Sequence, residues 1–262
     1  MRYFFIKQSD LAGLKAVVKG SDAHHIKNVL RLKPGDKIGL FDGTGLNYET
    51  RIVTLLPKSI EVSVIRSFPS ATESSVDITV AQALLKDRKM DLLVRQLTEL
   101  GITRWMLVRQ LTELGITRWI PFIAKRSVPR PDKKRLFTRT ERWKKIAKEA
   151  VKQCKRSCPL IIGATVSFEE VLNLGKDSDL KIVFWEEESK PVDKELLISN
   201  VKPVEKIFIL LGPEGGFTLK EVENAKASGF IAAALGPRIL RAETATIAAS
   251  TLLQYLFGDM GK

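Results

Sequence analysis

The chain has 262 residues, of which 44% are hydrophobic, so it is long enough to bury a substantial core in one or two domains. Its formal net charge of +13 is spread unevenly along the sequence. No run of about 18 apolar residues occurs, which argues against a membrane-spanning helix. The first residues lack the basic and then apolar pattern of a leader segment, so we expect a cytoplasmic protein with no membrane partner.

The first 69 residues have the pattern of short strands separated by turns. Asp42-Gly43 is a turn signal, and Ile60 to Ile65 alternates as a half-buried strand does. The polar stretch that follows, 67–75, contains Pro69 and has the composition of a linker. We therefore predict one domain over 1–69 and a second over 76–262.

One segment of the chain occurs twice. Leu93 to Trp105 recurs letter for letter as Leu107 to Trp119. Two such units are too short for a solenoid. We expect one copy to complete the fold, with Ile116 to Ile123 as the strand after its helix. The other copy should be extruded or form an irregular helical extension.

The stretch from Lys125 to Arg156 carries 14 Lys or Arg residues against Asp132, Glu141 and Glu149. Helical spacing predicts a buried face made of Trp143, Ile146, Ala147, Ala150, Val151 and Cys154. The face that remains for water carries Lys144, Lys145, Lys148, Lys152 and Lys155. An ordinary solvated face is one explanation, but the concentration of one sign favours a surface that binds phosphates.

Two glycine-containing loops lie near the end of the chain. The first spans Leu211 to Thr218 and the second spans Leu235 to Ala245. Each follows a short apolar run and opens into a helical pattern. Two neighbouring strand–loop–helix corners of this kind form a concave surface at one edge of a sheet, where open α/β proteins bind ligands.

The helix after the first loop is well specified. Thr218 and Glu221 have the spacing of a capping box. Gly229 is a natural left-handed stop. Together these signals predict a helix from about Leu219 to Ser228.

The first loop has few side chains, because it contains Gly212, Gly215 and Gly216. A ligand can then lie against its backbone, although a tight turn that needs positive φ is an equal explanation. Neither loop matches the fingerprints that bind ATP or NAD. Glu214 would also repel a phosphate, so a ligand with a ribose, a base and a positive centre suits the loop better.

The two loops read GPEGGFT (212–218) and LGPRILRAETA (235–245), and together they resemble the ribosomal RNA small-subunit methyltransferase E family of the SPOUT superfamily. Other matching segments lie at 24–26, 29–31, 35–36, 41–43, 86–90, 113–115, 121–122, 126–128 and 149–159, and so cover nearly the whole chain. The tandem copy departs from the family, which has a single such segment.

The resemblance implies an α/β fold with two parts. Residues 1–69 would form a small PUA-like β-barrel that binds RNA, and 76–262 a SPOUT-type methyltransferase domain tied in a trefoil knot. It also implies a homodimer whose interface lies near the knotted region. The apolar face of the last helix, from Ile247 to Leu256, would contribute to that interface or else belong to the core.

The resemblance further implies S-adenosylmethionine as the methyl donor and methylation of uridine N3 in small-subunit (16S) ribosomal RNA. The substrate would be isolated RNA or the assembled subunit. Two alternatives stay open: a SPOUT methyltransferase that modifies another RNA position, such as a ribose 2′-hydroxyl, and a non-catalytic RNA-binding ribosome-assembly protein. No metal is expected, because Cys154 and Cys158 have no histidine nearby in the sequence to complete a zinc site.

On this resemblance the two loops hold the donor. The predicted donor-binding residues are Leu211, Gly212, Pro213, Glu214, Gly215, Gly216, Leu235, Gly236, Ile239, Leu240, Thr244 and Ala245. Loss of the N3 proton places negative charge on uracil, which basic groups stabilise. The catalytic candidates are therefore Arg241 and Arg126, with Glu243 to orient Arg241, accept a proton or simply cap its helix. The predicted RNA-binding residues are Arg31, Lys125, Lys144, Lys148 and Arg156.

Overall fold

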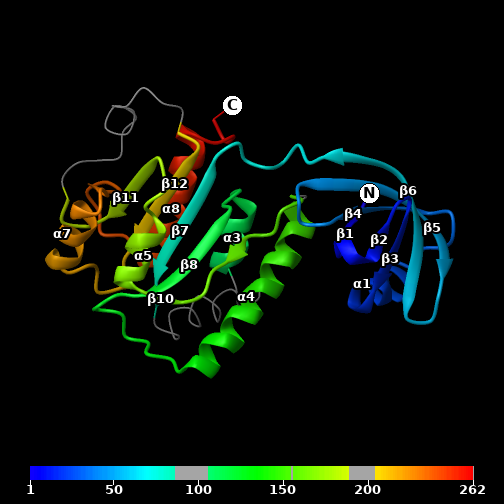
Figure 1. Ribbon diagram of the computed structural model, residues 1–262, viewed down its shortest axis with the longest axis horizontal. Helices are drawn as coiled ribbons and strands as arrows, with labels where there is room; N and C mark the ends of the chain where they lie inside the picture. Colours follow the sequence, from blue (N-terminus) through cyan, green and yellow to red (C-terminus); the bar gives the residue numbers. More distant parts are fainter. Residues whose placement is uncertain (86–105, 155, 189–203, 262) are drawn as a thin grey trace. The chain divides into compact units, whose positions relative to one another are not determined.

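A computed structural model describes residues 1–85, 106–154, 156–188 and 204–261, and Figure 1 draws them as ribbons. The chain folds into two compact units. Unit 1 contains Met1–Glu73 and Lys148–Pro159, and unit 2 contains Ser74–Ala147 and Leu160–Lys262. No helix among the described residues is long and apolar enough to cross a membrane.

Unit 1 is built on a mixed six-stranded sheet in the order β1-β4-β5-β6-β3-β2. Its strands are β1 (Tyr3–Phe5), β2 (Leu11–Ala12), β3 (Lys15–Lys19), β4 (Lys37–Phe41), β5 (Leu46–Leu55) and β6 (Ser59–Pro69). Only β1 and β4 pair in parallel among these described strands. The strand predicted at Ile60 to Ile65 lies within β6, and its residues Ile60 and Val62 are buried in the core.

Three short helical elements complete the first part of unit 1. They are η1 (Gln8–Asp10), α1 (Gly20–His24) and the π-helix η2 (His25–Val29). Ala23 of α1 and Ile26 of η2 are buried in the hydrophobic core of the unit. Just after η2, Arg31 adopts a left-handed backbone with φ of 54°.

Glu73 binds the segment 148–159, which belongs to unit 1, at several points. One carboxylate oxygen of Glu73 accepts hydrogen bonds from Nε and Nη2 of Arg156 at 3.0 and 2.7 Å. The other oxygen accepts from the backbone N–H groups of Ser157 and Cys158 at 2.6 and 2.9 Å. Ser157 Oγ also donates to Asn47 Oδ1 at 2.8 Å inside the unit.

Unit 2 contains a parallel sheet in the order β10-β8-β7-β12-β11-β13, with β9 paired to β8. Its strands are β7 (Asp77–Ala83), β8 (Arg118–Ile123), β9 (Ile161–Ile162), β10 (Val166–Ser167), β11 (Leu180–Phe184), β12 (Lys206–Leu211) and β13 (Ile231–Ala233). The helices are α3 (Met106–Glu113), α4 (Lys133–Cys154), α5 (Phe168–Leu174), α7 (Leu219–Ala227) and α8 (Ala242–Leu256).

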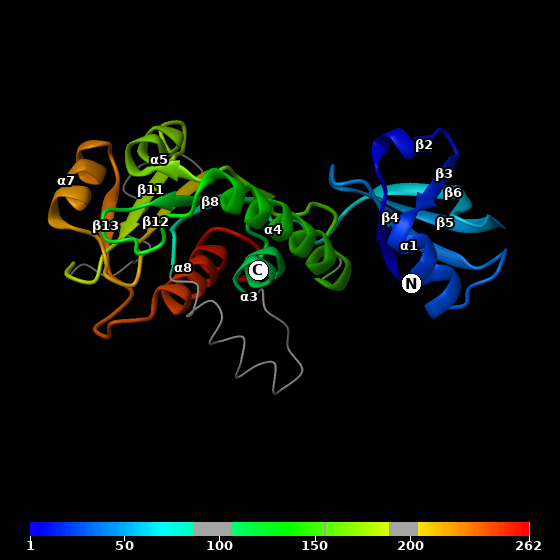
Figure 2. The ribbon, with the colours of Figure 1, turned by 90° about the horizontal axis from the view of Figure 1, so that it is seen from below.

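Helices cover both faces of this sheet (Figure 2). Side chains alternate along a strand, so successive residues of β12 point to opposite faces. Ile207 and Ile209 belong to the hydrophobic cluster that includes residues of α3, α4 and α8. Phe208 and Leu210 belong to the cluster with α5 and α7. The α/β architecture therefore has three layers, with the carboxyl ends of the parallel strands at one edge.

The structure shows what one copy of the repeated segment does. The second copy forms α3, a turn at Gly115 with φ of 77°, and the start of β8. The predicted strand is therefore confirmed, although it begins at Arg118 rather than Ile116. The first copy lies outside the described residues.

The predicted capping box is confirmed. Thr218 Oγ1 accepts a hydrogen bond from the N–H of Glu221 at 3.3 Å, and the Glu221 carboxylate accepts from the N–H of Thr218 at 2.9 Å. Helix α7 ends at Ala227, one residue before the predicted end, and Gly229 takes φ of 83° as a left-handed stop.

The basic helix α4 follows most of its predicted pattern. Of the predicted buried face, Trp143, Ala147, Ala150 and Val151 are buried, whereas Ile146 and Cys154 are half-buried. Of the predicted exposed lysines, Lys144, Lys145 and Lys148 are exposed, and Lys155 lies outside the described residues. The prediction that Lys152 faces water is wrong. Its side chain is 17% exposed, and its ammonium group lies 2.7 Å from Asp22 and 2.9 Å from Glu149. Burial alone lowers the pKa of Lys152, but these two carboxylates raise it above its ordinary value.

Replacing Glu73 with Gln should destabilise unit 1. The substitution removes the charge that neutralises buried Arg156, and breaking a buried ion pair costs about 3 kcal/mol. Urea denaturation of Glu73→Gln measures this loss. Glu61→Gln is the control, because Glu61 is exposed on β6 and its loss should cost less than about 0.5 kcal/mol. Equal stability of the two variants would contradict the role given to Glu73.

Candidate functional site

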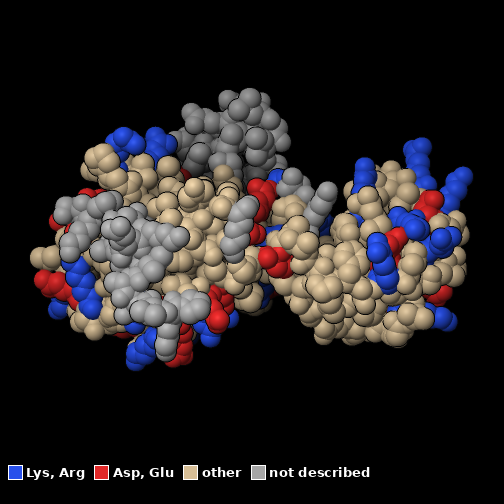
Figure 3. All heavy atoms as spheres, turned by 90° about the horizontal axis from the view of Figure 1, so that it is seen from above, with Lys and Arg blue, Asp and Glu red and all other residues tan. Residues whose placement is uncertain are grey.

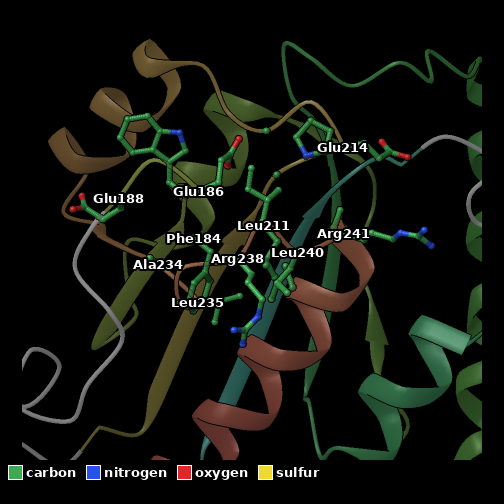
Figure 4. A pocket seen from close by; sticks show the side chains of 18 of the residues that line it. Phe184, Glu186, Glu188, Leu211, Glu214, Ala234, Leu235, Arg238, Leu240 and Arg241 are labelled. Atoms are coloured by element: carbon green, nitrogen blue, oxygen red, sulfur yellow. The ribbon is translucent and has the colours of Figure 1, made fainter.

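A cavity of about 390 Å³ lies at the carboxyl edge of the unit 2 sheet (Figure 4). Three chain segments form it: the end of β11, the loop after β12 and the loop between β13 and α8. Its lining consists of Phe184, Trp185, Glu186, Glu188, Leu211, Gly212, Pro213, Glu214, Gly216, Ala234, Leu235, Gly236, Pro237, Arg238, Ile239, Leu240, Arg241, Ala242 and Ala245. The two predicted loops therefore lie side by side and share one cavity.

The first loop makes a tight turn in which the N–H of Gly216 donates to the carbonyl of Pro213 at 2.9 Å. Of its three glycines, Gly216 has a positive φ, at 66°, so the turn explains only this one. A Cβ on Gly216 would overlap the carboxylate of Glu186. A Cβ on Gly215 would approach Cβ of Arg126 to 3.3 Å. The glycines thus allow two other side chains to lie close to the loop backbone.

The second loop leads directly into α8. Arg241 is the N-cap residue of that helix, and its carbonyl accepts from the N–H of Ala245 at 2.8 Å to close the first turn. Arg241, Ala242 and Ala245 all line the cavity. The amino end of α8, with its partial positive charge, therefore borders the cavity.

Charged side chains from all three segments line the cavity. In Figure 4, Glu186 and Glu188 lie near the end of β11, while Arg238 and Arg241 come from the loop before α8. Glu188 is 3.4 Å from Lys226. The side chain of Arg241 is exposed and extends away from Leu240 in this view. The cavity thus presents both carboxylates and guanidinium groups to a ligand.

A buried amide lies beneath the first loop. Gln82, at the end of β7, is 2% exposed, and its Nε2 donates to the carbonyls of Leu211 at 3.4 Å and Gly212 at 3.0 Å. Its Oε1 accepts a hydrogen bond from Oγ1 of Thr246 in α8, which is fully buried. One side chain therefore connects β7, the first loop and α8.

The end of β8 holds the same loop from another side. The N–H of Lys125 donates to the carboxylate of Glu221 at 2.8 Å. Nη1 of Arg126 donates to the carbonyls of Gly215 at 2.8 Å and Phe217 at 3.3 Å. Arg126 thus reaches the predicted loop, but its guanidinium is engaged with the loop backbone and is not among the described residues that line the cavity.

The structure brings most of the predicted donor-binding residues together. Those that line the cavity are Leu211, Gly212, Pro213, Glu214, Gly216, Leu235, Gly236, Ile239, Leu240 and Ala245. Gly215, in the first loop, and Thr244, in the first turn of α8, are not among the described residues that line the cavity. Of the catalytic candidates, Arg241 lines the cavity, and Glu243 is half-buried in the first turn of α8.

The prediction missed the wall at the end of β11, which consists of Phe184, Trp185, Glu186 and Glu188. This segment follows an apolar run like those before the two loops, and that run was the available signal. Its place beside β12, with Val183 opposite Leu210, depends on strand pairing that the sequence does not reveal.

The predicted RNA-binding residues fall into different environments. Arg31 and Lys125 are exposed. Lys144 lies 2.8 Å from Glu141, and the ammonium of Lys148 lies 4.5 Å from the centre of the Phe5 ring. The prediction that Arg156 contacts RNA has to be corrected. Arg156 is 5% exposed and bound to Glu73, so its guanidinium is not available on the surface.

Lys and Arg side chains stand beside Asp and Glu side chains on the face of unit 1 drawn in Figure 3. In the same unit, the two carboxylate oxygens of Glu49 lie 2.8 Å from Lys37 and 2.8 Å from Arg66. These two cations lower the pKa of Glu49. Cations neutralised in this way contribute less to the attraction of a polyanion.

Within the described part of the chain, no three His, Cys, Asp or Glu residues are placed to hold a metal ion. Cys154 and Cys158 are both free thiols. Burial raises the pKa of Cys158, and the nearby Glu73 raises it further, although Arg156 opposes this, so the neutral thiol is favoured at neutral pH.

Comparisons with known proteins match both units. Residues 105–254 match the model of an RNA methyltransferase domain, and residues 18–65 match that of an RNA methyltransferase PUA domain. The ribosomal RNA small subunit methyltransferase E of Bacillus subtilis is 32% identical over 241 residues, which cover 91% of this chain and 89% of that protein. The protein of the same name from Buchnera aphidicola subsp. Acyrthosiphon pisum is 28% identical over 236 residues, which cover 90% of this chain and 86% of that protein.

Solved structures agree with this match. The ribosomal RNA small subunit methyltransferase E of Neisseria gonorrhoeae, bound to S-adenosyl methionine, has a TM-score of 0.82 at 27% identity and covers 99% of both chains. A putative methyltransferase from Legionella pneumophila, in complex with the same cofactor, has a TM-score of 0.81 at 25% identity, again over 99% of both chains. With its two matched domains, its glycine loops and a relative 32% identical along nearly its full length, the chain belongs to the ribosomal RNA small subunit methyltransferase E family.

Proposed function

We propose that the protein transfers a methyl group from S-adenosylmethionine to N3 of a uridine in small-subunit (16S) ribosomal RNA. The observation that carries this proposal is the cavity that the loops 212–216 and 234–241 share with the end of β11. Two solved relatives that resemble the chain over 99% of its length contain the same donor. Family membership supplies the class of substrate, and the choice of N3 is our proposal.

The cavity has the groups that this donor needs. Leu211, Leu235 and Leu240 offer apolar surface for the adenine, and the glycine backbone lets the nucleoside approach closely. Glu186 and Glu214 offer carboxylates to hydroxyl or positively charged groups. When bound, the donor supplies an electrophilic methyl group, so the residues of the protein have to position it and stabilise the charge that develops on the acceptor.

Arg241 is the candidate for that charge. Removal of the N3 proton leaves negative charge shared by N3 and the neighbouring carbonyl oxygens of uracil. Arg241 borders the cavity at the amino end of α8, where its charge and the helix dipole both favour an anion. Glu243, in the first turn of α8, is the candidate to orient Arg241 or accept the proton. We assign Arg126 to support of the first loop.

We propose that unit 1 and the basic stretch 125–156 bind RNA. Exposed Arg31, Lys125, Lys144 and Lys148 are the candidates for phosphate contacts. Because N3 lies on the pairing edge of uracil, the target base must be unpaired or flipped out of a helix. We accordingly propose an RNA-binding domain over 1–69 and a methyltransferase domain over 76–262, in a cytoplasmic enzyme.

Three finer features of the family are also proposed for this chain. We infer that unit 2 is a SPOUT domain with a trefoil knot, which is compatible with the return of α8 to β7 and β12 after β13. The barrel closure of the PUA-like domain is a second proposal. The third is a homodimer through α8, for which the 62% exposed Tyr255 is a candidate contact, whereas Leu253 is fully buried in the core. Sedimentation would give the oligomeric state directly.

Replacing Arg241 with Ala should lower the rate of methyl transfer by about 100-fold, because one group that stabilises a developing anion is removed. Binding of S-adenosylhomocysteine should change much less. Single-turnover methylation of small subunits from a strain lacking the gene measures the rate, and mass mapping of the RNA locates the product. Lys220→Ala on the outer surface of α7 is the control. A full rate in Arg241→Ala, or a methyl group on a ribose 2′-hydroxyl, would contradict the proposal.

Replacing Gly216 with Ala should weaken donor binding. The new methyl group would displace the Glu186 carboxylate and strain a backbone at φ of 66°. Calorimetry with S-adenosylhomocysteine should show an affinity roughly tenfold lower, which corresponds to about 1.4 kcal/mol of binding free energy. Gly13→Ala is the matched control, because Gly13 has φ of 58° with no atom within 4 Å of its Cβ. If both variants bind equally well, Glu186 and the turn do not shape the donor site.

Removing Arg31 or Lys148 should make RNA binding less dependent on salt. The slope of log affinity against log salt is negative, and each lost phosphate contact reduces its magnitude by about 0.7 to 0.9. Fluorescence anisotropy with a fragment of the ribosomal RNA measures the slope. Lys37→Ala provides the comparison, since Lys37 is already paired with Glu49 and its loss should leave the slope unchanged. An unchanged slope in Arg31→Ala and Lys148→Ala would place the RNA elsewhere.

A further inference from the structure

We propose that Gln82 and Thr246 are positioning residues that set the shape of the donor cavity. They do so by holding the first loop and the start of α8 at a fixed separation. Neither side chain is among the described residues that line the cavity, so both act through the groups they hold. The inference rests on the proposed function, because it concerns the binding of the methyl donor.

The side-chain amide of Gln82 contacts backbone carbonyls of residues in the cavity wall. Its Nε2 lies 3.1 Å from the carbonyl of Ala83, 3.4 Å from that of Leu211 and 3.0 Å from that of Gly212. Leu211 and Gly212 both line the cavity. A shift of the amide would therefore move the first wall directly.

The hydrogen bonds give the amide one orientation. All three neighbours of Nε2 are carbonyl oxygens, which only accept hydrogen bonds. The NH2 group must point toward them, and Oε1 must then point toward Thr246. The Thr246 hydroxyl also lies 2.8 Å from the carbonyl of Ala242. The hydroxyl has one proton to donate, and without that hydrogen bond Oε1 of Gln82 would be left unsatisfied.

Thr246 connects this amide to the second wall. It lies one residue after Ala245 and one helical turn after Ala242, both of which line the cavity. The loop 234–241 enters α8 immediately before them. Two side chains, Gln82 and Thr246, thus connect Gly212 in one wall to the start of α8 in the other through hydrogen bonds.

Packing alone does not require an amide at this position. Val80 in β7 and Leu84 just after it lie two residues before and two residues after Gln82, and both are buried in the apolar cluster with α8. A methionine has a similar volume and needs no hydrogen-bond partner. A buried amide is tolerated only when it is bonded, but it adds a direction that an apolar side chain lacks.

The test compares Thr246→Val with Ser250→Ala in the full chain. Valine keeps the branched shape of threonine and loses only the hydroxyl. Ser250 is the matched control, because it is also fully buried in α8, one turn later, and its hydroxyl donates at 2.7 Å to the Thr246 carbonyl within the helix. Calorimetry with S-adenosylhomocysteine gives the affinity, urea denaturation gives the stability, and steady-state methylation gives the donor KM and kcat.

We expect Thr246→Val to weaken binding of S-adenosylhomocysteine by roughly tenfold, and Ser250→Ala by less than about twofold. The donor KM should rise as much as the Kd. A purely structural role would reduce the amount of folded enzyme, and hence the apparent kcat, without changing KM. Thr246→Ser should restore most of the affinity, because it returns the hydroxyl. Gln82→Met should weaken binding at least as much as Thr246→Val where it folds.

Equal affinity in Thr246→Val and Ser250→Ala, with any loss confined to stability, would overturn the inference. Failure of Thr246→Ser to recover affinity would do the same, because the hydroxyl would then not be the relevant group. If the unaltered chain itself bound no S-adenosylhomocysteine, the proposed function would fail first. The two failures are therefore distinguished by the unaltered protein.

Discussion

The buried amide of Gln82 is the contact on which the architecture of the donor cavity depends. It joins β7, the loop after β12 and α8, which come from separate parts of the chain. Polar groups buried in an apolar layer must be bonded, so their partners are confined to a narrow set of positions. The two glycine loops follow β12 and β13, which both pair with β11, and the amide links the first loop to the helix that follows the second. Arg126 and Glu221 add a second set of bonds on the other side of the first loop.

Electrostatic groups are divided between structural and functional tasks. Glu73 neutralises Arg156 inside unit 1, and Asp22 and Glu149 hold Lys152. These cations contribute to the net charge but serve the fold. The candidates for contact with the polyanionic substrate that we propose are the exposed Arg31, Lys125, Lys144 and Lys148. Both carboxylates and guanidinium groups line the cavity, so it offers partners to groups of either charge on the donor.

Local patterns predicted the parts of the site that are local in the sequence. The Thr218–Glu221 capping box is such a part, because its bonds span three residues. The wall formed by Glu186 was missed, since its contact with Gly216 depends on the pairing of β11 with β12. Lys152 was misjudged for a similar reason, as its partner Asp22 lies 130 positions away in the chain. Helical spacing says which face is buried, but not which distant carboxylate meets a lysine on the other.

The central claim is that loops 212–216 and 234–241 form one cradle for the methyl donor. A crystal structure of the protein with S-adenosylhomocysteine tests it most directly. We expect the nucleoside between Gly212 and Leu240, with the thioether within reach of the Arg241 side of the cavity. A ligand bound outside this cavity, with the two loops unoccupied and apart, would contradict the account.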